Sequence, residues 1–173
     1  MKLSVFAVLL KDRPFDEACK YLAEAGVQQV EIGCGGYPGK EHCDPEVLLH
    51  DDKKLEEFKN TLKKYNLTIA GLSTHGNAVH PVPEIAKKFH DDFVNAVLLA
   101  EKLGVETVVT FSGCPGGSPV DRTPNWATCA WPEDYLEVLD YQWNKVLIPY
   151  WKEQAEFAKA HGIKKIAFEM HPG

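Results

Sequence analysis

Hydrophobic and polar positions follow one another along the chain in a unit that occurs four times. Each unit has an amphipathic stretch with helical spacing, then one glycine or asparagine, then a short apolar run. The residues at the change are Gly26, Asn66, Gly104 and Gly162. Glycine and asparagine readily adopt the left-handed conformation that closes a helix C-terminus. The pattern therefore predicts four helices that each lead into a strand, the fourth after an insertion of about 20 residues.

The periodicity of the apolar residues sets the expected limits of these elements. Spacings of three and four residues predict helices over 15–25, 55–65 and 85–103, and a fourth helical region over about 132–160. Pro149 lies inside the fourth region and should break or kink it, because proline has no N–H to donate. Short apolar runs predict strands over 3–10, 27–33, 67–74, 107–112 and 164–170.

Strands and helices alternate in this order, which is typical of a parallel sheet with right-handed crossovers. The spacing alone leaves two closures open, an open doubly wound sheet and a (β/α)8 barrel. In both architectures the functional residues lie at the carboxyl ends of the strands. We therefore look for chemistry where each predicted strand ends.

Polar residues do gather at those ends. They are Glu31 after the second strand, Ser73, His75 and Asn77 after the third, and Glu169 and His171 after the fifth. Side chains alternate between the two faces of a strand, so Glu169 and His171 should share one face while Phe168 and Met170 point to the helices. Ser73 and His75 should share a face in the same way, and Asn77 could follow.

A carboxylate and imidazoles that meet at the mouth of a parallel barrel suit a divalent metal and proton transfer. His171 follows Glu169 by two residues, about 6–7 Å along a strand, so it is a candidate for the base or for the residue that orients the base. Simpler interpretations exist for two of these residues. Glu169 could form only a salt bridge, and His75 could be a hydrogen-bonded residue of the pocket wall.

Two other motifs are weaker. The glycine-rich loop over 33–39 suggests a nucleotide site, but its third glycine is misplaced for the G-x-G-x-x-G pattern, and Pro38 and Pro45 argue against an immediate helix. His42 and Cys43 suggest zinc, but no second pair follows at finger spacing. We assign neither motif a cofactor.

Composition narrows the function classes. The net charge is −6 with no basic cluster, which opposes a nucleic-acid partner. Five cysteines without a CxxC pair are typical of a reduced, cytoplasmic protein. The chain has no apolar run of about 18 residues, and no cleavage site follows its first apolar stretch, so we expect neither a membrane span nor a signal peptide.

Three segments together resemble a known family, the xylose-isomerase-like TIM barrels, which comprise sugar and sugar-phosphate isomerases and epimerases and also the endonuclease IV type of repair enzyme. The segments are Val-Glu-Ile-Gly over 30–33, Ser-Thr-His-Gly-Asn over 73–77 and Phe-Glu-Met-His-Pro-Gly over 168–173. The resemblance covers the whole chain and implies a (β/α)8 barrel. Residues 1–173 would form the N-terminal portion of a single domain, with strands one to five.

The resemblance also implies roles for particular residues. Glu169 would be a catalytic residue and the first of four ligands to one divalent metal, most suitably Mn²⁺, with Mg²⁺, Co²⁺ or Zn²⁺ as alternatives. The other three ligands would come from strands six to eight. His75 would line the substrate pocket, Phe6 would form an apolar wall, and Glu31 and Asn77 would also contact the sugar. Trp126, in the insertion after strand four, would belong to a lid.

The reaction implied is the isomerisation or epimerisation of a sugar through proton abstraction beside a carbonyl. The segment also resembles the catalytic subunits of bacterial C-glycoside deglycosidases, which implies a lyase alternative: β-elimination from a 3-keto C-glycoside, with the tryptophans of the insertion stacked on the aglycone. An abasic-site endonuclease is opposed by the −6 charge, and a flavodoxin-like binding protein by the missing phosphate loop.

The length bears on activity. A whole barrel needs about 250 residues, whereas this chain ends at Gly173, at the mouth of strand five. We expect the 173-residue segment alone to be inactive, with strands one and five as open edges. A third interpretation is therefore a catalytically inert half barrel that pairs with a copy of itself or with a complementing chain.

Overall fold

The computed structural model describes residues 2–129 and 131–170, and its centre is one sheet of five parallel strands. The strands are β1 (Ser4–Phe6), β2 (Gln29–Gly33), β3 (Thr68–Ser73), β4 (Thr107–Thr110) and β5 (Lys165–Phe168). They lie in the order β1-β2-β3-β4-β5, so each strand pairs with the next one along the chain. This is the order expected of the first five strands of a (β/α)8 barrel.

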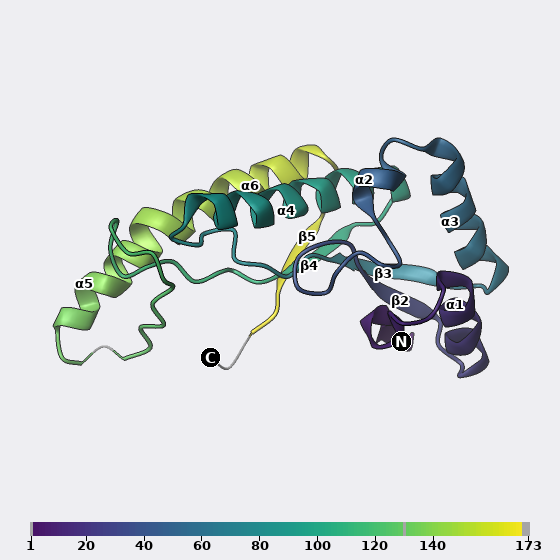
Figure 1. The fold of residues 1–173 in the computed structure, drawn as a ribbon, viewed down its shortest axis with the longest axis horizontal. Coiled ribbons are helices and arrows are strands. Elements are labelled where there is room, and N and C mark those ends of the chain that lie inside the picture. Colours follow the sequence, from purple (N-terminus) through teal and green to yellow (C-terminus); the bar gives the residue numbers. More distant parts are fainter. Residues whose placement is uncertain (1, 130, 171–173) are drawn as a thin grey trace.

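The helices connect these strands and cover one side of the sheet. They are α1 (Phe15–Glu24), α2 (Pro45–Leu48), α3 (Asp52–Lys64), α4 (Pro83–Leu103), α5 (Asp134–Asp140) and α6 (Ile148–Ala160). Figure 1 shows α4 and α6 running along each other, with α1 and α3 beside the first strands. Aromatic contacts join α4 to α6, including an edge-to-face pair between Phe93 and Trp151 with centroids 5.5 Å apart.

The predicted helix ends are confirmed. Gly26, Asn66, Gly104 and Gly162 all have positive φ, from +54° at Asn66 to +82° at Gly26. Asn66 is the only residue other than glycine with a positive φ among the described residues. Each change from helix to strand is therefore set by the residue at the turn.

The first strand is shorter than its apolar run predicts. It ends at Phe6, and Ala7–Leu10 form a 3₁₀ helix instead. β2 offers partners only to Ser4–Phe6, so the following residues satisfy their hydrogen bonds locally, as in the bond from the Lys11 N–H to the Val8 carbonyl. A short apolar run does not distinguish these two outcomes.

Pro149 does not break the fourth helical region. The helix continues from α5 through a π-helical segment, Tyr141–Leu147, into α6, and Pro149 occupies the first turn of α6. The wider π turn changes the hydrogen-bond pattern immediately before the proline, so the missing N–H is accommodated. Of the expected break or kink, a break is therefore wrong, and the helix is instead distorted locally as a π-helical segment just before the proline. Pro45 likewise begins the short helix α2, where Asp44 caps the Glu46 N–H.

The core lies between the sheet and the helices. Val30, Ile32 and Val108 face the helices and are fully buried, whereas their neighbours Glu31 and Val109 are half-buried on the opposite face. That opposite face would line the inside of a barrel. No helix among residues 2–129 and 131–170 is long and apolar enough to cross a membrane.

Candidate active site

The strand ends bring together Glu31, Ser73, His75 and Glu169. Glu31 lies on β2, and the Ser73 hydroxyl at the end of β3 donates a 2.5 Å hydrogen bond to its carboxylate. Ser73 is fully buried and Glu31 half-buried. A hydrogen bond to a charged acceptor is stronger than one between neutral groups, so the serine fixes the orientation of the Glu31 carboxylate.

His75 and Glu169 form the second pair of the site. Nε2 of His75 lies 2.8 Å from Oε2 of Glu169. In spite of this short distance, Nε2 makes no hydrogen bond of regular geometry among the described residues. The imidazole is 3% exposed, whereas the Glu169 side chain is 58% exposed. A buried ring nitrogen without a partner next to an accessible carboxylate is an arrangement that a polar ligand could complete.

Aromatic rings surround His75. The Phe6 ring lies 6.1 Å from the His75 ring, and the Phe111 ring packs edge-to-face against it with centroids 4.6 Å apart. Phe6 therefore lies where an apolar wall beside His75 would be. Phe111 was not among the predicted site residues, although it follows the last residue of β4 directly, which is the position that marks a barrel mouth.

β5 places Glu169 at the mouth through the alternation of its side chains. Phe168 points away from the site and packs on Trp151 of α6, with centroids 4.6 Å apart. Met170, expected to face the helices as well, is instead 93% exposed because the strand ends at Phe168. The predicted base, His171, lies outside the described residues.

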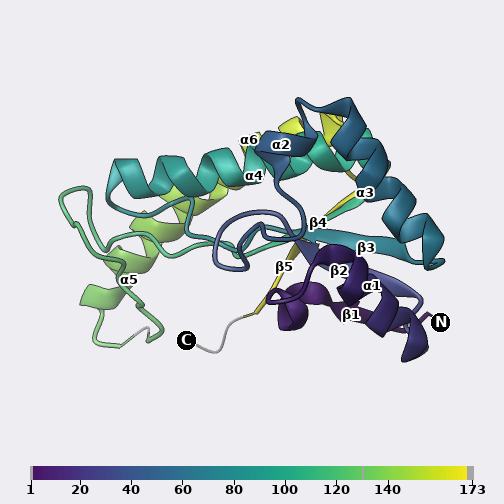
Figure 2. The same ribbon diagram turned by 45° about the vertical axis from the view of Figure 1, so that its right-hand side comes forward.

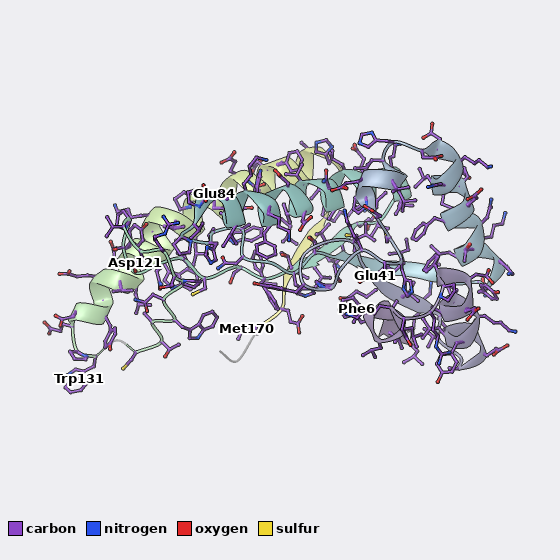
Figure 3. All side chains as sticks on the ribbon, in the orientation of Figure 1. Phe6, Glu41, Glu84, Asp121, Trp131 and Met170 are labelled. Carbon is purple, nitrogen blue, oxygen red and sulfur yellow. The ribbon has the colours of Figure 1, made fainter. Side chains whose placement is uncertain are left out.

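Asn77 and Trp126 take other positions. The Asn77 amide donates to the Cys114 carbonyl at 2.7 Å and accepts from the Cys114 N–H at 3.1 Å, so it holds the start of the loop that follows β4. Trp126 lies further along this loop and is 55% exposed. Figure 3 shows Trp131 at the far end of the molecule, well away from Phe6.

The site can supply part of a metal centre. Among the described residues, no three His, Cys, Asp or Glu side chains lie together as a metal ion would require. Glu169 nevertheless has the properties of a single metal ligand, because its carboxylate is accessible and lies beside an imidazole nitrogen without a well-directed partner. The described residues could therefore supply one carboxylate, that of Glu169, to a metal site whose other ligands come from elsewhere.

A hollow of the described surface lies elsewhere. It has a volume of about 340 Å³ and is lined by residues such as Gly26, Gln28 and Asn66, at the amino ends of the strands. Residues at the amino ends of the strands of a parallel barrel typically serve packing and stability, whereas the reacting groups lie at the carboxyl ends. We therefore place the candidate site at the carboxyl ends, where the paired polar groups are.

Comparison with known proteins agrees with this fold. Residues 19–173 match the family described as "Xylose isomerase-like TIM barrel". The chain belongs to this family, whose members include sugar isomerases and epimerases. A curated relative from Bacillus subtilis (strain 168), named "Uncharacterized protein YfiH", is 37% identical over 171 residues, which cover 98% of this chain and 54% of the relative.

Solved structures show the same fold at lower identity. A putative xylose isomerase from Rhodospirillum rubrum superposes with a TM-score of 0.68 at 17% identity, over 100% of this chain and 55% of that one. A D-tagatose 3-epimerase-like protein gives 0.62 at 21% identity, over 100% and 54%. A xylose isomerase-like TIM barrel protein from Mycobacterium smegmatis in complex with magnesium gives 0.58 at 16%, over 98% and 55%.

Two conclusions follow. The predicted fold, a partial (β/α)8 barrel covering about strands one to five, is confirmed. The chain spans about half the length of the curated relative and of the solved structures that it matches.

Proposed function

We propose that this chain forms part of a metal-dependent isomerase or epimerase that acts on a sugar by abstracting a proton beside a carbonyl. The observation that carries the proposal is the His75–Glu169 pair, in which a buried imidazole nitrogen without a well-directed partner lies 2.8 Å from an accessible carboxylate. Membership of a family that contains sugar isomerases and epimerases supports the same reaction class.

The residues of the site would divide the work. His75 would donate a hydrogen bond from Nε2 to a substrate oxygen, since that nitrogen has no better partner within the described chain. Glu31, held by Ser73, would accept hydrogen bonds from sugar hydroxyls. Phe6, beside His75, would exclude water from one side of the sugar.

Glu169 would be the one ligand that this chain gives to a divalent metal, with Mn²⁺ the first candidate and Mg²⁺, Co²⁺ or Zn²⁺ as alternatives. Such an ion stabilises negative charge that develops on a carbonyl oxygen. The remaining ligands would come from outside the described residues. The proposal also keeps His171 as the base or as the residue that orients it, because the sequence pattern over 164–171 predicts that it shares a face with Glu169.

A lyase is the second candidate, favoured by the exposed indoles of the insertion. Trp126 is 55% and Trp131 is 78% exposed, so an aromatic aglycone could stack on one of them. The substrate would then be a 3-keto C-glycoside, cleaved by β-elimination. Proton abstraction beside a carbonyl is common to both reactions, so the same residues serve either.

The test compares Glu169→Gln with Glu153→Gln in the full-length protein. Glu153 is an exposed residue of α6 and serves as the matched control. We expect Glu169→Gln to weaken Mn²⁺ binding, measured by titration calorimetry, and to lower turnover of 2-ketohexoses, with D-tagatose as the first probe. Metal affinity and turnover should each fall by more than about a hundredfold, because replacing a residue that only supports a metal ligand already costs up to about a hundredfold.

The outcomes separate the candidates. Release of an aglycone from a 3-keto C-glycoside, without epimerisation of any ketohexose, would favour the lyase. Unchanged metal affinity in Glu169→Gln would remove Glu169 from the metal site. A full-length wild-type protein that binds Mn²⁺ but turns over neither substrate class would contradict both reactions.

A further inference from the structure

The glycine-rich loop over 33–39 has no role in the site described so far, yet it lies over its edge. Figures 1 and 2 show the segment after β2 curling at the ends of β2 and β3 before it reaches α2. We infer that this loop exists to present Tyr37 as a specificity-determining residue, whose ring stacks on one face of the bound sugar. The inference rests on the proposed sugar isomerase or epimerase function.

The loop is fixed closely against the end of β3. The Tyr37 N–H donates a 2.7 Å hydrogen bond to the His75 carbonyl, and the Gly36 N–H donates a 3.0 Å bond to Oδ2 of Asp92 on α4. Gly36 has a φ of +66°, and a Cβ at this position would collide with the His75 carbonyl oxygen. Only glycine permits this approach, so the loop places the next residue directly beside a site residue.

The Tyr37 side chain is exposed in spite of this fixed backbone. Its ring is 5.2 Å from the Phe89 ring and 6.4 Å from the Phe111 ring, and Phe111 itself packs on His75. Even so, Tyr37 is 66% exposed. Phe89 in turn fills the space that a side chain at Gly76 would need, so the ring beneath Tyr37 is also fixed.

Exposure alone would mean little, because single exposed aromatic residues are common. The difference here is that a backbone hydrogen bond fixes Tyr37 beside His75, and two aromatic neighbours contact its ring before any ligand arrives. A sugar ring has an apolar face of C–H groups, and covering it with a flat aromatic ring removes apolar surface from water. A ring already held in place loses little conformational freedom when it binds.

The test uses Tyr37→Ala, Tyr37→Leu and Tyr37→Phe in the full-length protein, with Tyr21→Ala as control. Tyr21 is an exposed tyrosine of α1. With D-tagatose and other 2-ketohexoses as probes, Tyr37→Ala should raise KM by about three- to tenfold, with kcat changed less than about twofold. Tyr37→Phe and Tyr21→Ala should leave KM within about twofold of the wild-type value.

Tyr37→Leu separates stacking from packing. Leucine keeps an apolar contact with Phe89 but has no flat face, so its KM should rise as in Tyr37→Ala. Wild-type KM in both Tyr37→Ala and Tyr37→Leu, in a protein that turns over ketohexoses, would overturn the role of Tyr37. A wild-type protein without any such turnover would contradict the proposed function itself, so the two failures are distinguishable.

Discussion

The cysteine side chains range from buried to exposed, and burial changes the acidity of their thiols. Cys19, Cys34 and Cys43 are buried, and desolvation raises the pKa of Cys19 and Cys43 to about 12 and that of Cys34 well above its usual range. Cys129, in the insertion after β4, is exposed. Since the thiolate is the reactive form, the native chain has one accessible thiol, three inert ones and one half-buried thiol, Cys114.

We therefore predict one fast reaction with a thiol reagent such as DTNB at pH 8. Cys129 should react first, and Cys114 more slowly, because it is half-buried and desolvation raises its pKa. The three buried thiols stay protonated at any pH well below 12, so they should react only when the protein unfolds. Cys129→Ser should abolish the fast phase. Any fast thiol that remains in that variant would contradict the described burial.

At the residue scale, alternation along a strand could be predicted because it is local. Phe168 packs toward α6 and Glu169 lies at the mouth beside His75, as the sequence of β5 alone indicates. Loop residues could not be placed in this way. The position of Tyr37 depends on a hydrogen bond from its neighbour Gly36 to Asp92, 56 residues away, and nothing near Tyr37 in the sequence signals that contact.

At the element scale, one side chain of the π-helical segment helps to hold the insertion after β4. Nε2 of Gln142 lies 2.6 Å from the Asn125 carbonyl and 3.3 Å from the carbonyls of Pro115 and Gly116. Gln142 is buried, and its contacts join the start of the insertion, at Pro115 and Gly116, to its middle, at Asn125. Single π turns often occur where a helix must present a particular side chain.

We predict that Gln142→Ala loosens the insertion without unfolding the barrel. The three carbonyls would lose this donor, but those of Pro115 and Asn125 keep the N–H groups of Asn125 and Ala127, so the cost should be about 1–1.5 kcal/mol. Arg122 is exposed within the insertion, so tryptic cleavage after Arg122 should become about tenfold faster through more frequent local opening. Asn144→Ala, an exposed position on the same helical segment, is the control. Equal cleavage rates in the two variants would contradict the anchoring role.

Features that a single residue determines were predicted correctly, whereas features that depend on a neighbouring element were not. Helix ends at Gly104 and Gly162 follow from the conformational freedom of a single residue, so the sequence suffices. The length of β1 depends on how far β2 runs alongside it, and the effect of Pro149 depends on the π turn before it. Both are set by neighbours that a hydrophobic pattern does not reveal.

At the scale of the whole molecule, the sheet has one covered and one open face. Val108 faces the helices and is fully buried, whereas Val109 faces what would be the barrel interior and is half-buried. In the described part of the chain, β1 pairs only with β2 and β5 only with β4. Strands six to eight of a barrel would pair with both edges and bury the inner face.

Val109→Lys distinguishes the open sheet from the closed barrel. In the 173-residue chain the lysine would extend into water from a half-exposed position, and the free energy of unfolding should fall by less than about 1 kcal/mol. In a full-length protein with a closed barrel the same lysine would be buried without a partner, which costs about 3 kcal/mol or more.

The measurement is urea unfolding of both forms, with Val120→Lys as control, because Val120 is 86% exposed in the insertion and should tolerate lysine in either form. A large effect confined to the full-length protein would mean that additional strands close over Val109 and complete the pocket around Glu169. The same small effect in both forms would mean that the inner face stays in contact with water. A sugar could not then be enclosed there, and the inert half barrel would become the better description of the chain.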